Sequence, residues 1–145
     1  MKMTGHSLRH FTEGACAEMA VASGMGLPWR DEVIGEVGPF HVRWTRRLDG
    51  PLIVLSEDDD DMLCLLVVNR STLEFQLVGV VRAGDAKRPE FKRQTKNDST
   101  AYFVPQSHLT SIEEIAAIFP DGKIGRRLGA HDLINAYLRT RISPH

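Results

Sequence analysis

Seven consecutive apolar residues, Met62 to Val68, constrain the folding of this chain more than any other feature. A strand with one face in water alternates apolar and polar residues, so an unbroken apolar run predicts a central strand covered on both faces. A further strand, Leu73 to Val81, follows the polar segment Asn69 to Ser71, and we expect the two strands to pair. We therefore expect a mixed sheet flanked by helices.

A helix is predicted ahead of this β structure, over Ser7 to Ser23. Its apolar residues recur at spacings of three or four and form one stripe, which consists of Leu8, Phe11, Ala15, Met19 and Ala22. Glu18 lies within that stripe. A carboxylate on the buried side of a helix needs a partner, such as a metal ion, a base or a hydrogen-bond donor.

The segment from Val33 to Val81 is predicted to be β structure. Apolar and polar residues alternate from Phe40 to Thr45, as in a strand with one buried face. The apolar face, expected in the core, consists of Phe40, Val42 and Trp44. The polar face consists of His41, Arg43 and Thr45. A turn at Asp49-Gly50 leads to a short apolar strand, Leu52 to Leu55.

The chain becomes more polar after Val81. We expect a long loop from Asp85 to Thr100, because it has little periodicity. A short strand at 102–104 follows. Thr110 or Ser111 can cap a helix over 112–119, and a last amphipathic helix is expected over His131 to Arg141.

This order of elements predicts an α+β fold: a helix, a β-meander and a mixed C-terminal part. The 145 residues suit one domain, 1–145, in which Gly122 to His145 is a candidate for a loosely attached helical extension. No apolar run approaches the roughly 18 residues that span a bilayer, and the N-terminus lacks a hydrophobic signal core. Cys16 and Cys64 lie among apolar neighbours, as reduced thiols do. We therefore expect a cytoplasmic protein without a membrane partner.

Basic residues are concentrated between Arg82 and Lys96, where six of them stand against two acidic residues. Such a stretch can follow a phosphate backbone, and it is also typical of a solvated loop. Composition alone does not distinguish a segment that binds nucleic acid from a solvated loop.

The segment EVGPFHVRWT, residues 36–45, places an acidic residue before a strand that carries His41 and Arg43 two positions apart. This pattern resembles the core motif of the PD-(D/E)xK nuclease superfamily, in which a strand carries an acidic residue, a spacer and a lysine. The resemblance implies a restriction-endonuclease-like core with a carboxylate from its helix. Glu18 fits that helix position and Glu36 the first acidic position, while His41 and Arg43 occupy the second acidic and lysine positions.

The wider sequence also resembles a family of small proteins encoded by phages and prophages, roughly over residues 10 to 115. The matching pieces are ACAEMA at 15–20, VG at 37–38, VR at 42–43, LIV at 52–54, DDDD at 58–61, GDAKRPE at 84–90 and YFVPQS at 102–107.

Together these resemblances imply a phage or prophage DNA-processing protein, either a metal-dependent nuclease or a catalytically reduced relative that binds DNA. The cofactor would be Mg²⁺ or Mn²⁺, held by Glu18 and Glu36, because hard cations prefer carboxylate oxygens. The catalytic set would be Glu18, Glu36, His41 and Arg43. DNA would be bound by Arg46, Arg47, Lys87, Arg88, Lys92, Arg93 and Lys96.

Three departures from the superfamily motif affect this interpretation. The imidazole of His41 is a poor Mg²⁺ ligand, although Mn²⁺ and Zn²⁺ accept it. The guanidinium of Arg43 keeps its proton, so it can act as an electrostatic clamp and not as a base. Glu36 lies five residues before His41, which puts the two on opposite faces of an unbroken strand, so a bulge or kink at Gly38-Pro39 is needed to bring them together.

Alternatives to these roles remain open at the level of sequence. Glu18 can pair with Arg43 in a structural salt bridge, and His41 can simply face solvent. The acidic run 58–61 lacks calcium-loop spacing and is more typical of a solvated turn. The alternative function is a non-enzymatic protein that binds a host or phage protein through the acidic turn, 57–61, or through the terminal helix, 131–141.

Overall fold

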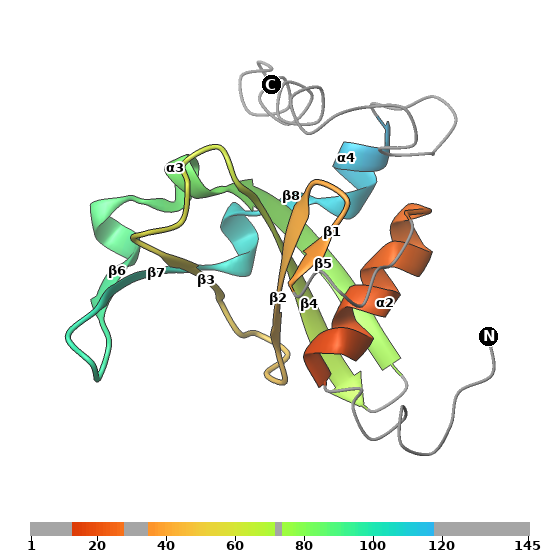
Figure 1. Cartoon of the computed structure of the whole chain (residues 1–145), viewed down its shortest axis with the longest axis horizontal. Helices are drawn as coiled ribbons and strands as arrows, with labels where there is room; N and C mark the ends of the chain where they lie inside the picture. Colours follow the sequence, from red (N-terminus) through yellow and green to blue (C-terminus); the bar gives the residue numbers. More distant parts are fainter. Residues whose placement is uncertain (1–12, 28–34, 72–73, 118–145) are drawn as a thin grey trace.

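The computed structural model describes residues 13–27, 35–71 and 74–117. It has an α+β fold: an N-terminal helix, α2 (Glu13–Met25), a mixed five-stranded sheet and a small antiparallel three-stranded sheet. The strand order is β1-β2-β4-β5-β8 in the larger sheet and β3-β7-β6 in the smaller one. In Figure 1, α2 lies on one side of the larger sheet, and β3, β6 and β7 lie on the other.

The centre of the larger sheet is β4 (Leu63–Ser71), which runs parallel to β2 (Phe40–Thr45) and antiparallel to β5 (Glu74–Arg82). Residues 63–69 are all buried. Leu63, Leu65 and Val67 pack in the cluster that includes α2, whereas Cys64 and Leu66 pack against the smaller sheet. The prediction of a central strand covered on both faces is confirmed, as is its pairing with the strand that follows. The predicted β-meander is wrong, because β3 belongs to the smaller sheet and β2 and β4 are parallel neighbours.

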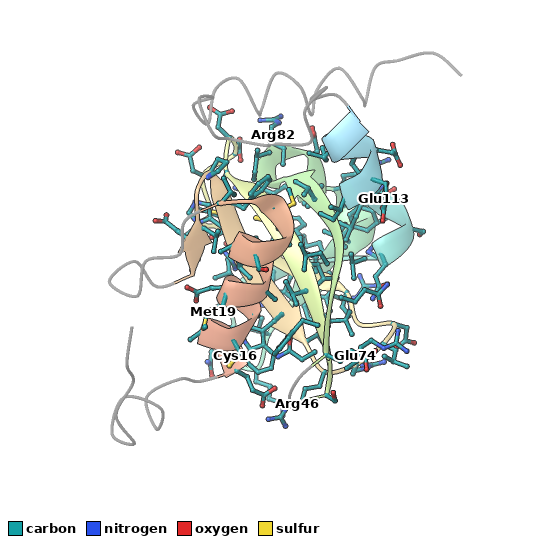
Figure 2. The ribbon with its side chains drawn as sticks, turned by 90° about the vertical axis from the view of Figure 1, so that its right-hand side faces the viewer. Cys16, Met19, Arg46, Glu74, Arg82 and Glu113 are labelled. Carbon is teal, nitrogen blue, oxygen red and sulfur yellow. The ribbon has the colours of Figure 1, made fainter. Side chains whose placement is uncertain are left out.

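The buried face of α2 differs from the predicted stripe. Ala17, Glu18, Val21 and Met25 are buried, whereas Met19 is 38% exposed. The predicted stripe is confirmed at Ala22 and wrong at Met19, because the face that carries the small residue Ala17 packs against the sheet instead. In Figure 2, which looks onto α2 with the sheet behind it, Met19 is labelled at the left-hand edge of the helix. The start of the predicted helix, 7–12, lies outside the described residues.

Strand β2 confirms half of its expected apolar face. Phe40 and Val42 are buried beneath α2, but Trp44 is 41% exposed, so its predicted core position is wrong. A Trp side chain tolerates partial exposure because one part of its large ring can pack against protein while the other part contacts water. A two-residue turn, Gly38-Pro39, joins β2 to β1 (Glu36–Val37) in a hairpin.

The smaller sheet contains β3 (Leu52–Leu55), β7 (Thr100–Val104) and β6 (Lys92–Gln94). The first two confirm predicted strands. The prediction of a loop from Asp85 to Thr100 was wrong in part, since this segment contains β6, the 3-10 turn η1 (Pro89–Phe91) and the end of the short helix α3 (Ala83–Ala86). All three residues of β6 are exposed, so this edge strand has no alternation from which it could be recognised.

The described chain ends with η2 (Gln106–His108), β8 (Thr110–Ser111) and α4 (Ile112–Ala117). Ser111 caps α4: its hydroxyl accepts a hydrogen bond from the Glu114 backbone N–H at 3.1 Å. The cap is therefore Ser111 and not Thr110. The helix predicted over 131–141 and the candidate extension 122–145 lie outside the described residues. Within the described ranges, no helix is long and apolar enough to cross a membrane.

An ion pair joins the two sheets. Both carboxylate oxygens of Asp58 lie 3.2 Å from Nη2 of Arg43, which extends from β2. Arg43 also donates to the Ile53 carbonyl, and Asp58 accepts from the Leu55 N–H at 2.7 Å. The pair thus satisfies outward-facing backbone groups on the free edge of β3. Asp58 is only 9% exposed, so the expectation that the whole acidic run is solvated is wrong for this residue.

Replacing Asp58 by alanine should therefore be costly, because it leaves the Arg43 guanidinium and the Leu55 N–H without their acceptor. We expect the free energy of unfolding, measured by urea denaturation, to fall by about 2 to 3 kcal/mol. Glu57→Ala, at the exposed neighbouring position, is the control and should change it by less than about 0.5 kcal/mol. Equal losses in the two variants would contradict a joining role for Asp58.

Candidate functional site: the hairpin face of β2

The polar side chains of β2 point away from α2, toward the smaller sheet. Phe40 and Val42 face α2, so the alternate residues, His41, Arg43 and Thr45, share the opposite face. Cys64 lies beside His41 on the neighbouring strand, and burial raises the pKa of its thiol to about 11. This thiol stays protonated at neutral pH and is no nucleophile.

Glu36 joins this face through the β1–β2 hairpin. Glu36 and His41 are directly opposite each other in the antiparallel register, so their side chains lie on the same face. The Oε1 atom of Glu36 is 3.4 Å from Nε2 of His41, and both side chains are partly exposed. The hairpin therefore brings Glu36 and His41 together on one face of the sheet.

This geometry replaces the bulge that an unbroken strand would have needed. Gly38 has a φ of +56°, and Val37 pairs with Phe40 across the turn. A positive φ at the first of two turn residues is the glycine position of a type II′ hairpin, which proline can follow. Gly-Pro between two apolar residues was the available sequence signal for a hairpin.

Glu18 lies on the other side of the sheet from Glu36. It is 7% exposed, and its Oε2 accepts a hydrogen bond from the Gly35 N–H at 3.0 Å. The Gly35 carbonyl in turn accepts from the Val42 N–H at 2.7 Å. Glu18 thus holds the residue that precedes Glu36, and it does not converge with Glu36 on one metal position.

The alternative salt bridge between Glu18 and Arg43 is wrong. Arg43 points to the opposite face of the sheet and is paired with Asp58. Sequence reasoning missed Asp58 as this partner because nothing in a run of four aspartates distinguishes the buried one.

The described ranges, 13–27, 35–71 and 74–117, contain no group of three or more His, Cys, Asp or Glu side chains that could hold a metal ion. The hairpin face offers a carboxylate and an imidazole, Glu36 and His41. That donor pair suits Mn²⁺ or Zn²⁺ better than Mg²⁺.

The basic candidates differ in how far their charges are already neutralised. Arg46 forms a two-point ion pair with Glu13 at the start of α2, near the lower end of the molecule in Figure 2. Arg47 has a 75% exposed side chain, with the Asp49 carboxylate 3.8 Å away. Arg88 is paired with Glu90. Within the described part of the chain, no carboxylate partner is recorded for the exposed residues Lys92, Arg93 and Lys96.

The side chain of Lys87 is held by hydrogen bonds to the acidic turn, 57–61. Its ammonium group donates to the Ser56 and Asp58 carbonyls and to Oδ1 of Asp60, at 3.1, 2.5 and 2.8 Å. These contacts use all three of its N–H donors. The hydrogen bond and charge of Lys87 hold the pKa of the Asp60 carboxyl below its usual range. Lys87 therefore fastens the acidic turn to the segment after α3.

A groove of about 460 Å³ lies between β2 and β3. It is lined by Val42, Arg43, Trp44, Thr45, Arg47, Pro51, Ile53, Leu66 and Phe103. The groove begins on the strand face that carries the Glu36–His41 pair. Sequence analysis did not identify it, because its two walls come from strands of different sheets.

Comparisons of the chain with models of known protein families, with curated proteins and with solved structures found no match.

The position of Glu18 generates a prediction that separates a hydrogen-bonding role from a metal-binding one. Glu18→Ala removes the acceptor of the buried Gly35 N–H, so the free energy of unfolding should fall by about 1 to 3 kcal/mol. Glu18→Gln keeps an oxygen at that position and should lose about half of that or less. Urea denaturation in the presence of a chelator measures both variants, and equal losses would contradict the positioning role.

Proposed function

We propose that this chain is a DNA-binding protein of the phage or prophage type, a catalytically reduced relative of the PD-(D/E)xK nucleases. DNA lies across the hairpin face of β2, where Glu36, His41 and Arg43 correspond to the nuclease motif. The single observation that carries the proposal is the pairing of Glu36 with His41 at 3.4 Å on the face that also bears Arg43.

The pairing of Glu36 with His41 supports a restriction-endonuclease-like core. The five-residue separation of these two residues would put them on opposite faces of an unbroken strand, and the hairpin puts them on the same face. The resemblance requires the acidic residue that precedes the strand to come close to the second position on that strand. Here a two-residue hairpin puts Glu36 directly opposite His41.

The contacts at the site favour binding over hydrolysis. Phosphodiester hydrolysis of this kind requires carboxylates that converge on a metal ion beside a cation that can reach the scissile phosphate. Here Glu18 bonds to Gly35 on the other side of the sheet, and the charge of Arg43 is neutralised by Asp58. His41 replaces a carboxylate. We therefore infer that DNA is held and is not cut in Mg²⁺.

The cations available for phosphate contacts are Arg47, beside the groove, and the exposed set Lys92, Arg93 and Lys96 on β6 and the turn after it. Arg47 follows β2, whereas the β6–β7 turn lies at the left-hand end of the molecule in Figure 1. The ion pairs of Arg46 and Arg88 must open before either residue can contact phosphate. We therefore expect these two residues to contribute less to the affinity for DNA.

Salt-dependent binding to a fluorescent DNA oligonucleotide tests this function. We expect binding at low salt, a logarithmic affinity that falls linearly with the logarithm of salt concentration, and a slope about 1 unit smaller in Arg47→Gln. Arg47→Glu should weaken binding about tenfold at low salt.

Arg70→Glu is the matched control, because Arg70 is also exposed but lies at the end of β4, outside the groove. It should retain affinity within about threefold. The absence of DNA binding at low salt, or an equal loss in the two charge reversals, would contradict the proposal.

A gain-of-function variant tests the correspondence with the nuclease motif. His41→Glu places a second carboxylate against Glu36, and the two like charges repel unless a cation lies between them. We expect the melting temperature of this variant to rise in millimolar Mg²⁺, while that of the wild type does not change. A variant that is equally indifferent to Mg²⁺ would count against a metal-site geometry at this hairpin.

A second candidate function, binding to a host or phage protein, is favoured by the exposed apolar side chains. Trp44, Leu48 and Ile53 are 41, 61 and 40% exposed. Exposed apolar patches commonly mark protein interfaces. Capture of a specific protein together with an absence of DNA binding would favour this alternative.

A further inference from the structure

The groove between β2 and β3 combines positive charge with an apolar wall. Of the residues that line it, Arg43 and Arg47 are the charged ones, and no carboxylate is among them. Arg43 is already bound to Asp58 and Ile53, whereas the guanidinium of Arg47 is largely exposed. An anionic ligand therefore fits the groove better than a cationic one.

The apolar wall is formed on the smaller sheet. Ile53 and Phe103 are direct cross-strand partners on β3 and β7, so their side chains lie on one face. Their neighbours Leu52 and Val104 are fully buried in the core, which puts Ile53 and Phe103 on the outer face. Ile53 is 40% exposed, so a flat apolar ligand that covered it would remove apolar surface from water.

The groove continues the candidate site of the hairpin. His41, Arg43 and Thr45 lie on one face of β2, and the strand rise puts His41 and Thr45 about 13 Å apart. A ligand that passes the Glu36–His41 pair and follows β2 therefore reaches the groove and then Arg47. The volume of about 460 Å³ is in the range of sites for small organic groups.

From these observations we infer that the groove holds an unpaired base of single-stranded nucleic acid, with Arg47 on the adjoining phosphate. This inference rests on the proposed function and specifies its ligand. A base in a duplex is covered by its stacked neighbours and cannot present a face to Ile53 and Phe103. An unpaired base can, and stacking on an aromatic side chain stabilises it without regard to sequence.

The experiment compares three fluorescent probes on the full chain by anisotropy: a mixed-sequence single strand, the duplex of the same length, and the single strand with its bases replaced by abasic sites. The abasic strand keeps the phosphate charges and lacks only the groups that would enter the groove. We expect the intact single strand to bind at least about tenfold more tightly than either of the other two.

Two matched variants locate the effect in the groove. Ile53→Glu should weaken single-strand binding about tenfold or more, because it puts a carboxylate into the groove. Met19→Glu introduces the same charge at a residue of similar exposure, 38%, on α2, which lies on the opposite side of the larger sheet from β3, and should change binding less than about threefold. The abasic comparison uses the wild type, so it decides the question even where a variant does not fold.

The outcomes separate this inference from the proposed function. Equal binding of single strand and duplex, or of intact and abasic strands, overturns the inference and leaves DNA binding in place. Binding of no nucleic acid at low salt overturns both. Tighter binding of an acidic peptide that contains phenylalanine than of any nucleic acid overturns both in favour of a protein partner for the groove.

Discussion

The burial of β4 on both faces is the constraint from which the rest of the structure follows. Its residues alternate between two cores: Leu63, Leu65 and Val67 pack toward α2, and Cys64 and Leu66 pack toward the smaller sheet. An apolar strand of this kind cannot be half covered without leaving large side chains in water. The helix and the smaller sheet are therefore both required, and β2, next to β4, lies where the two layers meet.

The polar face of β2 supplies contacts to this junction as well as a surface for a ligand. Arg43 reaches across to the free edge of β3 and is held there by Asp58, so this residue helps to join the sheets. Glu18 similarly holds the backbone just before Glu36. The Glu36–His41 pair and the groove between β2 and β3 remain open to solvent. Because these contacts already engage Arg43 and Glu18, we propose that the chain binds DNA and does not hydrolyse it.

Much of the fold was predictable from the sequence because it rests on local periodicity. The apolar run at β4, the alternation at the start of β2 and the short strand β3 each carried their own signal. The contacts that decide function were harder to predict, because they join distant parts of the chain. Burial of Asp58 depends on Arg43, and the groove depends on two strands from different sheets. The Glu36–His41 hairpin was within reach, since Gly38-Pro39 is a turn sequence that also permits a bulge.

The position of bound DNA on the molecule decides whether the hairpin face of β2 is the binding surface. Backbone amide chemical shifts of the labelled protein, recorded as a DNA oligonucleotide is added, report which residues meet the ligand. We expect changes that are concentrated at His41, Thr45, Arg47 and Ile53, with the residues of α2 unaffected. Changes confined to α2, with none along β2, would contradict it.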